Sequence, residues 1–270
     1  MNLNTTVAVT TDGGDVKNRL AVSAKNDLAF QFASRLLAGT SFEYFQAAGW
    51  QILPDFISAP DCVAFNQALT PLFDAQLTSG KNRIGGVRNL LGTHDRVTAF
   101  AHHLQVLDIL ARATGRAIFP VRAIFFDKNP AANWLVPWHQ DLAIPVKRQI
   151  DTPGFHGWSI KDGICHVHPP AEILAGMVTL RLHLDDCSAA NGALRVISGS
   201  HLAGKIPSDQ VSAWTEAHPA ETCEVPQGGA LLMRPLLLHA SSPSEQPAHR
   251  RVLHIEYASQ LLPNGLNWLN

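Results

Sequence analysis

The chain has 270 residues, of which 46% are hydrophobic and 16% charged, and its 21 Lys and Arg residues nearly balance 22 Asp and Glu residues. This neutral composition argues against nucleic-acid and membrane partners, and no apolar run reaches the length of about 18 residues that a membrane span needs. The N-terminus lacks a secretory signal pattern, and none of the four cysteines forms a C-x-x-C pair. We therefore expect a cytoplasmic protein without a disulfide framework or a zinc knuckle.

Helical patterns dominate the first 115 residues. Residues 1–40 are predicted to be an N-terminal extension, partly loose, with apolar residues at helical spacing between 26 and 37. A strand and turn are expected at 50–56. Further helices are expected at 41–48, 60–77 and 95–114.

The pattern changes after Gly115, where short apolar or alternating runs lie between Pro, Gly and Asn residues. Such runs are typical of a β-sandwich or barrel. Residues 41–270 are therefore predicted to be a single domain, mainly β with flanking helices. A long irregular stretch at about 146–172 is predicted to be a lid-like insert, since long loops in compact domains are usually functional. The candidate strands are 117–126, 137–144, 177–184, 194–197, 221–225, 230–233, 236–240 and 250–257.

The strongest local signal for chemistry is the H-x-D pattern of His139 and Asp141. On a strand, both side chains point to one face. A third ligand from a distant strand would complete a set of two histidines and one carboxylate, which suits non-heme Fe(II). His239 at the end of a later apolar run is the natural candidate. Arg250, which begins the next strand, could hold a carboxylate through two parallel hydrogen bonds.

Several motifs in the same order resemble those of the phytanoyl-CoA dioxygenase-like family of Fe(II)/2-oxoglutarate-dependent oxygenases. The resemblance covers about residues 40–260. It implies a double-stranded β-helix (jelly-roll, cupin-like) core, one Fe(II), 2-oxoglutarate as cosubstrate and O2. The matching segments are 137–141 (PWHQD), 185–186 (DD), 191–194 (NGAL), 198–201 (SGSH), 228–231 (GGAL), His239 and Arg250.

The resemblance also implies roles for individual residues. His139, Asp141 and His239 match the iron ligands, Arg250 matches the arginine that pairs with the distal carboxylate of 2-oxoglutarate, and Gln140 matches a position that often touches the cosubstrate.

Arg181 departs from the family pattern, because it stands where relatives often have an aromatic residue near the cosubstrate. Strand alternation places Arg181 inside the barrel and Leu180 and Leu182 on the opposite face. A buried arginine must be paired. Its partner is 2-oxoglutarate, an anionic substrate, or an acidic residue of a neighbouring strand.

Four residues are candidate substrate contacts, each with a simpler structural alternative. Arg88 follows two glycines and could reach the mouth of the site, or lie on the surface. Trp158, His166 and His168 belong to the expected lid, and the two histidines could instead be solvated or form a second metal cluster with His156.

The function predicted from these residues is hydroxylation of a C–H bond in a small, polar or anionic molecule, with release of succinate and CO2. Desaturation, epoxidation and cyclisation are alternatives that would use the same iron centre. A non-redox, cupin-like metal- or ligand-binding protein is the alternative from another class.

Overall fold

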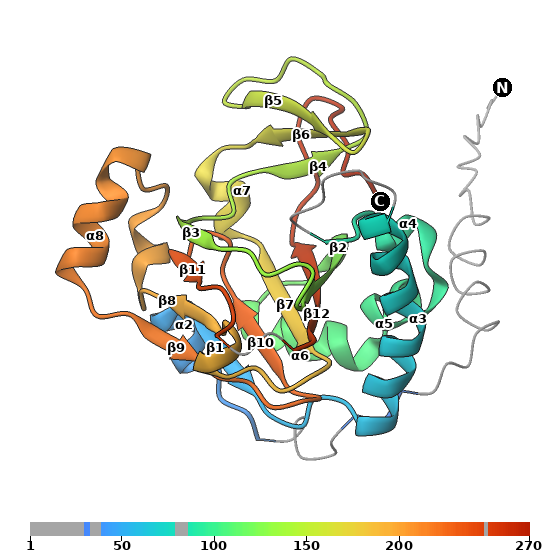
Figure 1. The fold of residues 1–270 in the computed structure, drawn as a ribbon. Helices are drawn as coiled ribbons and strands as arrows, with labels where there is room; N and C mark the ends of the chain where they lie inside the picture. The colour runs from blue at the N-terminus through green and yellow to red at the C-terminus, as the bar shows by residue number, and fades with distance from the viewer. Residues whose placement is uncertain (1–29, 33–38, 79–85, 246–247) are drawn as a thin grey trace, which may run out of the picture.

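The computed structural model describes residues 30–32, 39–78, 86–245 and 248–270. Its centre is a jelly roll in which two antiparallel sheets face each other (Figure 1). The larger sheet has the order β1 (Trp50–Leu53), β10 (Ala230–Met233), β7 (Val178–His183), β12 (Arg250–Ala258) and β2 (Phe119–Lys128). The smaller has the order β3 (Val136–His139), β11 (His239–Ser241), β8 (Leu194–Val196) and β9 (Glu221–Cys223). The expected mainly-β fold with flanking helices is confirmed.

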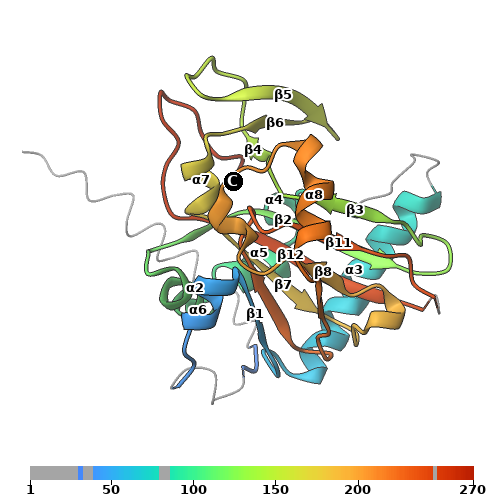
Figure 2. The same ribbon diagram turned by 90° about the vertical axis from the view of Figure 1, so that its left-hand side faces the viewer.

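A helical layer covers the outer face of the larger sheet (Figures 1 and 2). This layer contains α2 (Glu43–Ala48), α3 (Ala59–Thr78), α4 (Leu90–Thr93), α5 (Asp95–Ala101) and α6 (Leu104–Thr114). Two further helices, α7 (Ala171–Ala175) and α8 (Val211–Ala217), and three short 3-10 turns, η2 (Ala189–Asn191), η3 (Ser200–Ala203) and η4 (Ser208–Gln210), connect strands. None of the helices described is long and apolar enough to cross a membrane.

The main core lies between this layer and the larger sheet because the strands alternate. Leu180 and Leu182 of β7 and Leu253 of β12 pack with the buried faces of α3, α5 and α6. Arg181 and His183 of β7 are buried on the opposite face, inside the barrel. The leucine face expected for this strand is therefore confirmed.

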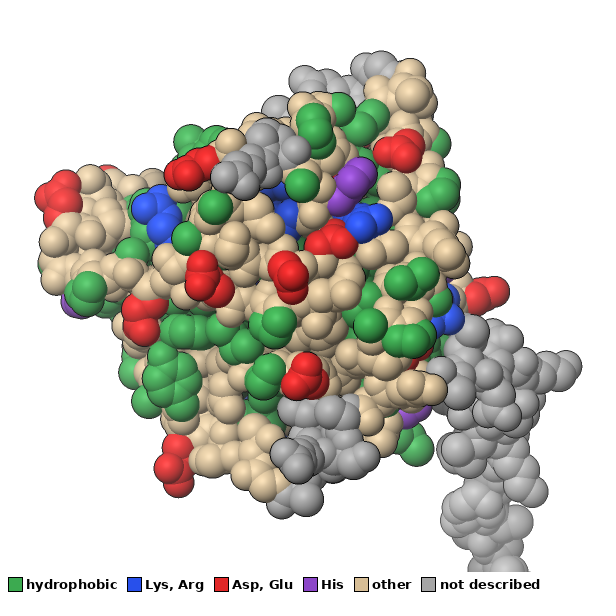
Figure 3. Space-filling model, turned by 60° about the horizontal axis from the view of Figure 1, so that its bottom comes forward, with side chains coloured by type: hydrophobic (Ala, Val, Ile, Leu, Met, Phe, Trp, Pro, Cys, Tyr) green, Lys and Arg blue, Asp and Glu red, His purple; other side chains and the backbone are tan. Residues whose placement is uncertain are grey.

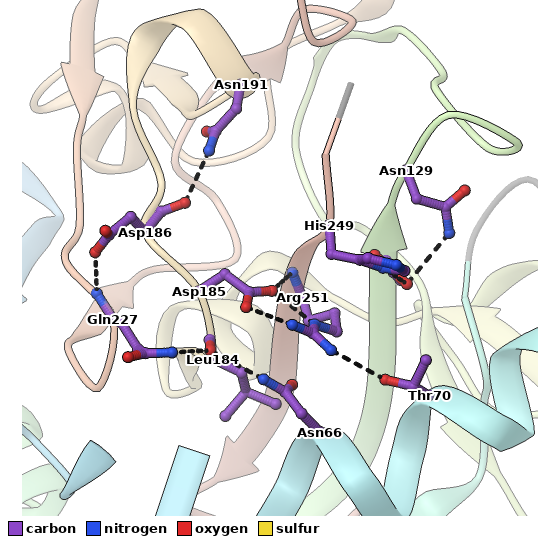
Figure 4. Close-up of polar contacts among 11 residues, drawn as sticks. Asn66, Thr70, Asn129, Leu184, Asp185, Asp186, Asn191, Gln227, His249 and Arg251 are labelled. Carbon is purple, nitrogen blue, oxygen red and sulfur yellow. Dashed lines mark hydrogen bonds and ion pairs between the residues drawn. The ribbon is translucent and has the colours of Figure 1, made fainter. Parts of the chain in front are cut away.

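Arg251 shows the same alternation on β12, one residue after Arg250. Its Nε and Nη2 donate to the Asp185 carboxylate over 2.7 and 2.6 Å, and Nη1 donates to Thr70 Oγ1 of α3 over 3.4 Å (Figure 4). These contacts fix Arg251 on the outside of the sheet, so Arg250 faces the interior. Asp186 Oδ1 accepts from the backbone N–H of Gln227 over 2.8 Å, which ties the turn after β7 to the segment before β10.

Three local predictions are wrong. Residues 30–32 are not helical, because Phe32 forms a bridge with Ile57; the rest of the predicted 26–37 helix lies outside the described residues. The predicted 95–114 helix is two helices, since His103 has extended backbone and its ring accepts from the N–H of Gln105, which makes His103 the N-cap of a new helix that begins at Leu104.

The insert is the third correction, because it is not an irregular loop. It forms a three-stranded antiparallel sheet with the order β4 (Ile144–Val146), β6 (Ile164–His168) and β5 (His156–Lys161). Five of the six β5 residues are exposed, so the strand has no alternating apolar pattern by which the sequence could reveal it.

The lower face of the molecule carries acidic side chains spread singly among hydrophobic and uncharged ones (Figure 3). This distribution agrees with the formal net charge of −1. A mixed surface of this kind offers no extended field of one sign to attract a polyanion.

Helix α6 allows a matched test of the helical layer. Leu110→Ala should lower the free energy of unfolding by about 2–5 kcal/mol, because the Leu110 side chain is fully buried against the sheet. Leu104→Ala in the same helix should change it by less than about 0.5 kcal/mol, because Leu104 is 81% exposed. Urea titrations of both variants measure the difference. Equal effects would contradict the packing described for α6.

Candidate metal centre

Two histidines from adjacent strands and one aspartate converge inside the jelly roll. His139 at the end of β3 pairs directly with His239 at the start of β11. The Nε2 atoms of His139 and His239 lie 3.6 and 3.8 Å from the two carboxylate oxygens of Asp141. One ligand atom from each of the three residues lies within 4.8 Å of the others. The sequence-predicted triad is therefore brought together.

Both imidazole rings are oriented by the backbone. His139 Nδ1 and His239 Nδ1 each lie 2.8 Å from a carbonyl oxygen, of Pro137 and Leu237 respectively. Since a carbonyl only accepts, Nδ1 carries a proton in both rings, which leaves the Nε2 atoms that face Asp141 as the nitrogens able to bind a metal. A carbonyl oxygen bonded to one ring nitrogen in this way orients the other nitrogen to bind a metal.

The electrostatics of the cluster keep Asp141 ionised. Burial alone would raise the pKa of Asp141, but His239 and His139 beside it hold that pKa well below its usual range. Burial lowers the pKa of His239 to about 4, which favours a neutral ring. One carboxylate and two imidazoles are the donor set of non-heme Fe(II) sites.

The hydrogen bonds support a metal at this point. Asp141 Oδ2 is buried and has no hydrogen-bond partner among the described residues. An ionised oxygen left in this state is costly unless a cation satisfies it. The Asp141 carboxylate and the two imidazole nitrogens that face it are ligands that fit a divalent iron.

The cluster opens into a cavity of about 300 Å³. Arg88, Arg181 and Arg250 line it, whereas Asp141 is the one acidic residue in its described lining. The remaining lining residues are Phe126, Trp134, Val136, His139, Leu194, His239, Ser241 and His254.

Arg250 lies inside the barrel and is 3% exposed. Its Nη1 donates to the Gly192 carbonyl oxygen over 2.7 Å, and its Nε has no partner among the described residues. Ser241 Oγ donates to the same carbonyl over 2.8 Å and accepts from Lys128 Nζ over 2.7 Å. Burial, with Arg250 nearby, lowers the pKa of Lys128 to about 7. These groups form a cationic, donor-rich region, and their contacts within the described part of the chain include no carboxylate.

Arg181 also reaches the cavity, as strand alternation predicts. Its Nη1 donates to His254 Nδ1 over 2.9 Å, and its guanidinium lies over the Phe126 ring at 5.8 Å. Burial, with Arg250 nearby, lowers the pKa of Arg181 to about 10, so the group remains a cation at neutral pH. Of the three partners left open for Arg181 by the sequence, an acidic residue of a neighbouring strand is not found among its described contacts.

Gln140 does not face the cavity, which corrects the cosubstrate role taken from the resemblance. Its Nε2 donates to the carbonyl oxygens of Gly204 and Leu236 over 2.8 and 2.6 Å, and its Oε1 accepts from Ile206 N–H over 2.8 Å. The alternation that brings His139 and Asp141 together directs Gln140 the other way. Its amide holds neighbouring loops together.

Of the four candidate substrate contacts, Arg88 alone belongs to the described cavity lining. Trp158 packs against the apolar cluster of the insert, and His166 Nδ1 lies 3.0 Å from the Ile164 carbonyl oxygen. The His168 ring lies 5.5 Å from that of His156. These three residues are structural parts of the small sheet, and the described residues provide no metal cluster there.

Sequence reasoning missed Lys128, Ser241 and His254. A signal was present for two of them. Ser241 is two residues after His239, and His254 is four residues after Arg250, so alternation places each on the inner face. Lys128 pairs with Arg250 across β2 and β12, which could not be known before the register.

The triad can be tested by metal binding alone. Asp141→Ala should lower Fe(II) affinity by at least about tenfold. Even substitution of a group that only hydrogen-bonds to a metal ligand lowers metal affinity by about 10–100-fold. His168→Ala should keep the wild-type affinity, because His168 lies outside the cluster. Iron content after dialysis measures both. Iron retained by Asp141→Ala and lost by His168→Ala would reverse the assignment.

Comparisons with known proteins agree with this geometry. L-proline trans-4-hydroxylase of Streptomyces griseoviridis is 26% identical over 245 residues, which cover 77% of this chain and 82% of the relative. The non-heme alpha-ketoglutarate-dependent carbocyclase SnoK from nogalamycin biosynthesis has a similar fold, with a TM-score of 0.63 and 14% identity over 85% of this chain and 87% of its own. EctD from S. alaskensis, solved with bound Fe, has a TM-score of 0.61 and is 14% identical, and the match covers 85% of this chain and 83% of EctD. Residues 45–252 match the family model described as phytanoyl-CoA dioxygenase (PhyH), and the chain belongs to that family of Fe(II)/2-oxoglutarate-dependent oxygenases.

Proposed function

We propose that the protein is a dioxygenase that hydroxylates a C–H bond of a small molecule. In the balanced reaction, substrate, 2-oxoglutarate and O2 give hydroxylated substrate, succinate and CO2. The observation that carries the proposal is the joint presence, in one cavity, of the His139–Asp141–His239 cluster and a buried Arg250 that has no acidic partner among the described residues. Iron and 2-oxoglutarate, when bound, supply the oxidising power, and the protein supplies binding and orientation.

One group of cavity residues would bind the metal, and another would bind the cosubstrate. His139, Asp141 and His239 would hold Fe(II). Arg250 would pair with the distal carboxylate of 2-oxoglutarate, and Ser241 beside it offers a further hydroxyl. Charge-assisted hydrogen bonds from a guanidinium are strong and geometrically specific, so they orient as well as bind the cosubstrate.

Hydroxylation is preferred to the other outcomes because the curated relative reported above is named as a hydroxylase. Desaturation, epoxidation or cyclisation would use the same cluster, and SnoK is named as a carbocyclase. A non-redox, cupin-like binding protein would not need a buried arginine to bind 2-oxoglutarate. The position of Arg250 therefore favours an oxygenase over a binding protein.

Residues 41–270 are proposed to form one oxygenase domain. The insert at about 146–172 is proposed to be its lid. Asp162, between β5 and β6, lies 3.1 Å from Nη1 of Arg88, which lines the cavity. The small sheet stands above β3 in Figure 1. A lid at this position would exclude water from the reacting centre.

A reducing, cytoplasmic setting is proposed from the cysteines. All four are unpaired, and burial raises the pKa of Cys62 to about 11 and that of Cys223 to about 12. Thiols of this kind are unreactive and need no oxidising compartment.

The decisive experiment measures succinate. Purified protein with Fe(II), 2-oxoglutarate and O2 is supplied with L-proline first and then with a panel of small molecules. Succinate that forms in step with a hydroxylated product, and that Asp141→Ala fails to form, supports the proposal. Binding of 2-oxoglutarate without succinate under any condition would favour the non-redox alternative.

Arg250 provides the prediction for the cosubstrate. Arg250→Gln should weaken 2-oxoglutarate binding by about 2–5 kcal/mol, because one charge of a buried pair is lost, while Fe(II) affinity stays close to wild type. Arg251→Gln is the matched control, because Arg251 pairs with Asp185 outside the barrel and should leave 2-oxoglutarate affinity unchanged. Calorimetric titration under argon measures both. An unchanged affinity in Arg250→Gln would end this assignment.

The lid is tested by amide hydrogen exchange. Exchange in β5 and β6 should slow when Fe(II) and 2-oxoglutarate are added, because closure protects the strands. Asp162→Asn, which removes the ionic partner of Arg88, should reduce this protection. Equal exchange with and without ligands would show that the small sheet is a fixed part of the barrel.

A further inference from the structure

Arg181 is a buried cation that has no role in holding the metal or the cosubstrate as proposed above. It is 6% exposed, and its Nε is buried without a hydrogen-bond partner in the described part of the chain. The partner that is found, His254, is a ring nitrogen and not a carboxylate. A guanidinium removed from water in this way needs an anion to compensate it.

The neighbours of Arg181 hold it firmly in place. Arginine only donates, so His254 Nδ1 is the acceptor and the ring proton is on Nε2. That Nε2 donates to Glu256 Oε1 over 3.1 Å, and Glu256 is in turn paired with Arg122. The chain of contacts fixes one tautomer of His254 and one orientation of the Arg181 guanidinium.

With Fe(II) and 2-oxoglutarate bound, the charges in the cavity would leave one positive charge without an anion. Fe(II) with Asp141 and the two carboxylates of 2-oxoglutarate leave one net negative charge, which Arg250 balances. Arg88 at the mouth already has Asp162 as its partner. The Arg122–Glu256 pair is neutral. Lys128 lies outside the described cavity lining and donates to Ser241 Oγ and the Ser242 carbonyl oxygen. Within that lining, Arg181 therefore remains as an uncompensated positive charge.

We propose that Arg181 binds a carboxylate of the substrate, so that the enzyme oxidises small carboxylic acids. This inference rests on the proposed function and narrows its substrate class. The metal-binding carboxylate of 2-oxoglutarate is the other source of the same chemistry. We assign the substrate because both charges of 2-oxoglutarate are already matched by the iron and Arg250.

The other walls of the cavity agree with a small acid. Trp134, Val136 and Leu194 give apolar surface, and the volume of about 300 Å³, which 2-oxoglutarate would share, is at the small end for ligand sites. A molecule with a compact carbon skeleton and one carboxylate would satisfy both the walls and Arg181.

The test measures binding without turnover. Protein loaded with Fe(II) and 2-oxoglutarate under argon is titrated with matched pairs of a small carboxylic acid and its primary amide, beginning with L-proline and L-prolinamide and including straight-chain, cyclic and aromatic acids. Wild type should bind the acid of the best pair at least tenfold more tightly than the amide. Arg181→Gln should bring this preference within twofold, and 2-oxoglutarate affinity should stay within threefold of wild type.

Two further variants keep the result interpretable. Arg88→Gln, at the mouth, should retain the preference for the acid. Arg181→Lys keeps the charge and loses the forked geometry, so it should show an intermediate preference, and it replaces Arg181→Gln if that variant does not fold by circular dichroism.

Three outcomes would overturn the inference. Wild type could show no preference for the acid in any pair, or the Arg181 variants could keep the preference. A loss of 2-oxoglutarate affinity of tenfold or more in Arg181→Gln would instead assign Arg181 to the cosubstrate. Failure of the proposed function is distinguishable, because wild type would then form no succinate while the carboxylate titration could still be read.

Discussion

The direct pairing of His139 with His239 across β3 and β11 is the constraint on which the site depends. In a strand, a slip of one residue turns every side chain to the other face, so either imidazole would leave the barrel if the register changed. On both strands the carbonyl two residues earlier holds the ring. The two histidines are therefore held by paired backbone, whereas Asp141 follows the end of β3 and is held through its backbone N–H, which donates to the Pro235 carbonyl oxygen over 2.9 Å.

The same barrel concentrates cations opposite this centre. Lys128 and Arg250 are register partners on β2 and β12, and Arg181 lies on the adjacent β7, where its register partner on β12 is the neutral His254. Buried like charges repel, and each lowers the tendency of its neighbour to stay protonated. This arrangement costs stability in the free protein. Because a ligand that binds only the folded state stabilises it, anionic ligands should offset that cost.

Much of the site follows from period-two alternation, and the errors arise where that rule was overridden or had no pattern to act on. The rule correctly places Arg181 inside the barrel and Arg251 outside it. Applied to the H-x-D motif, it also predicts that Gln140 faces away, but the family resemblance outweighed it. The three strands of the insert could not be predicted, because exposed β5 has no apolar period and β4 is only three residues long. Contacts such as Asp162 with Arg88 depend on how distant segments pack, which no local pattern records.

A second group of potential ligands shows how hydrogen bonds select the metal position. Asp141, His254 and Glu256 also offer ligand atoms within 4.8 Å of one another. In His254, however, Nδ1 accepts from Arg181 and Nε2 carries the proton donated to Glu256, so neither nitrogen has a free lone pair. Glu256 is also paired with Arg122. The Nε2 atoms of His139 and His239 face Asp141, and their Nδ1 atoms are bonded to backbone carbonyls, so each Nε2 is the nitrogen that a metal would bind. The two clusters share Asp141, and the fold leaves it one set of partners able to complete an iron site.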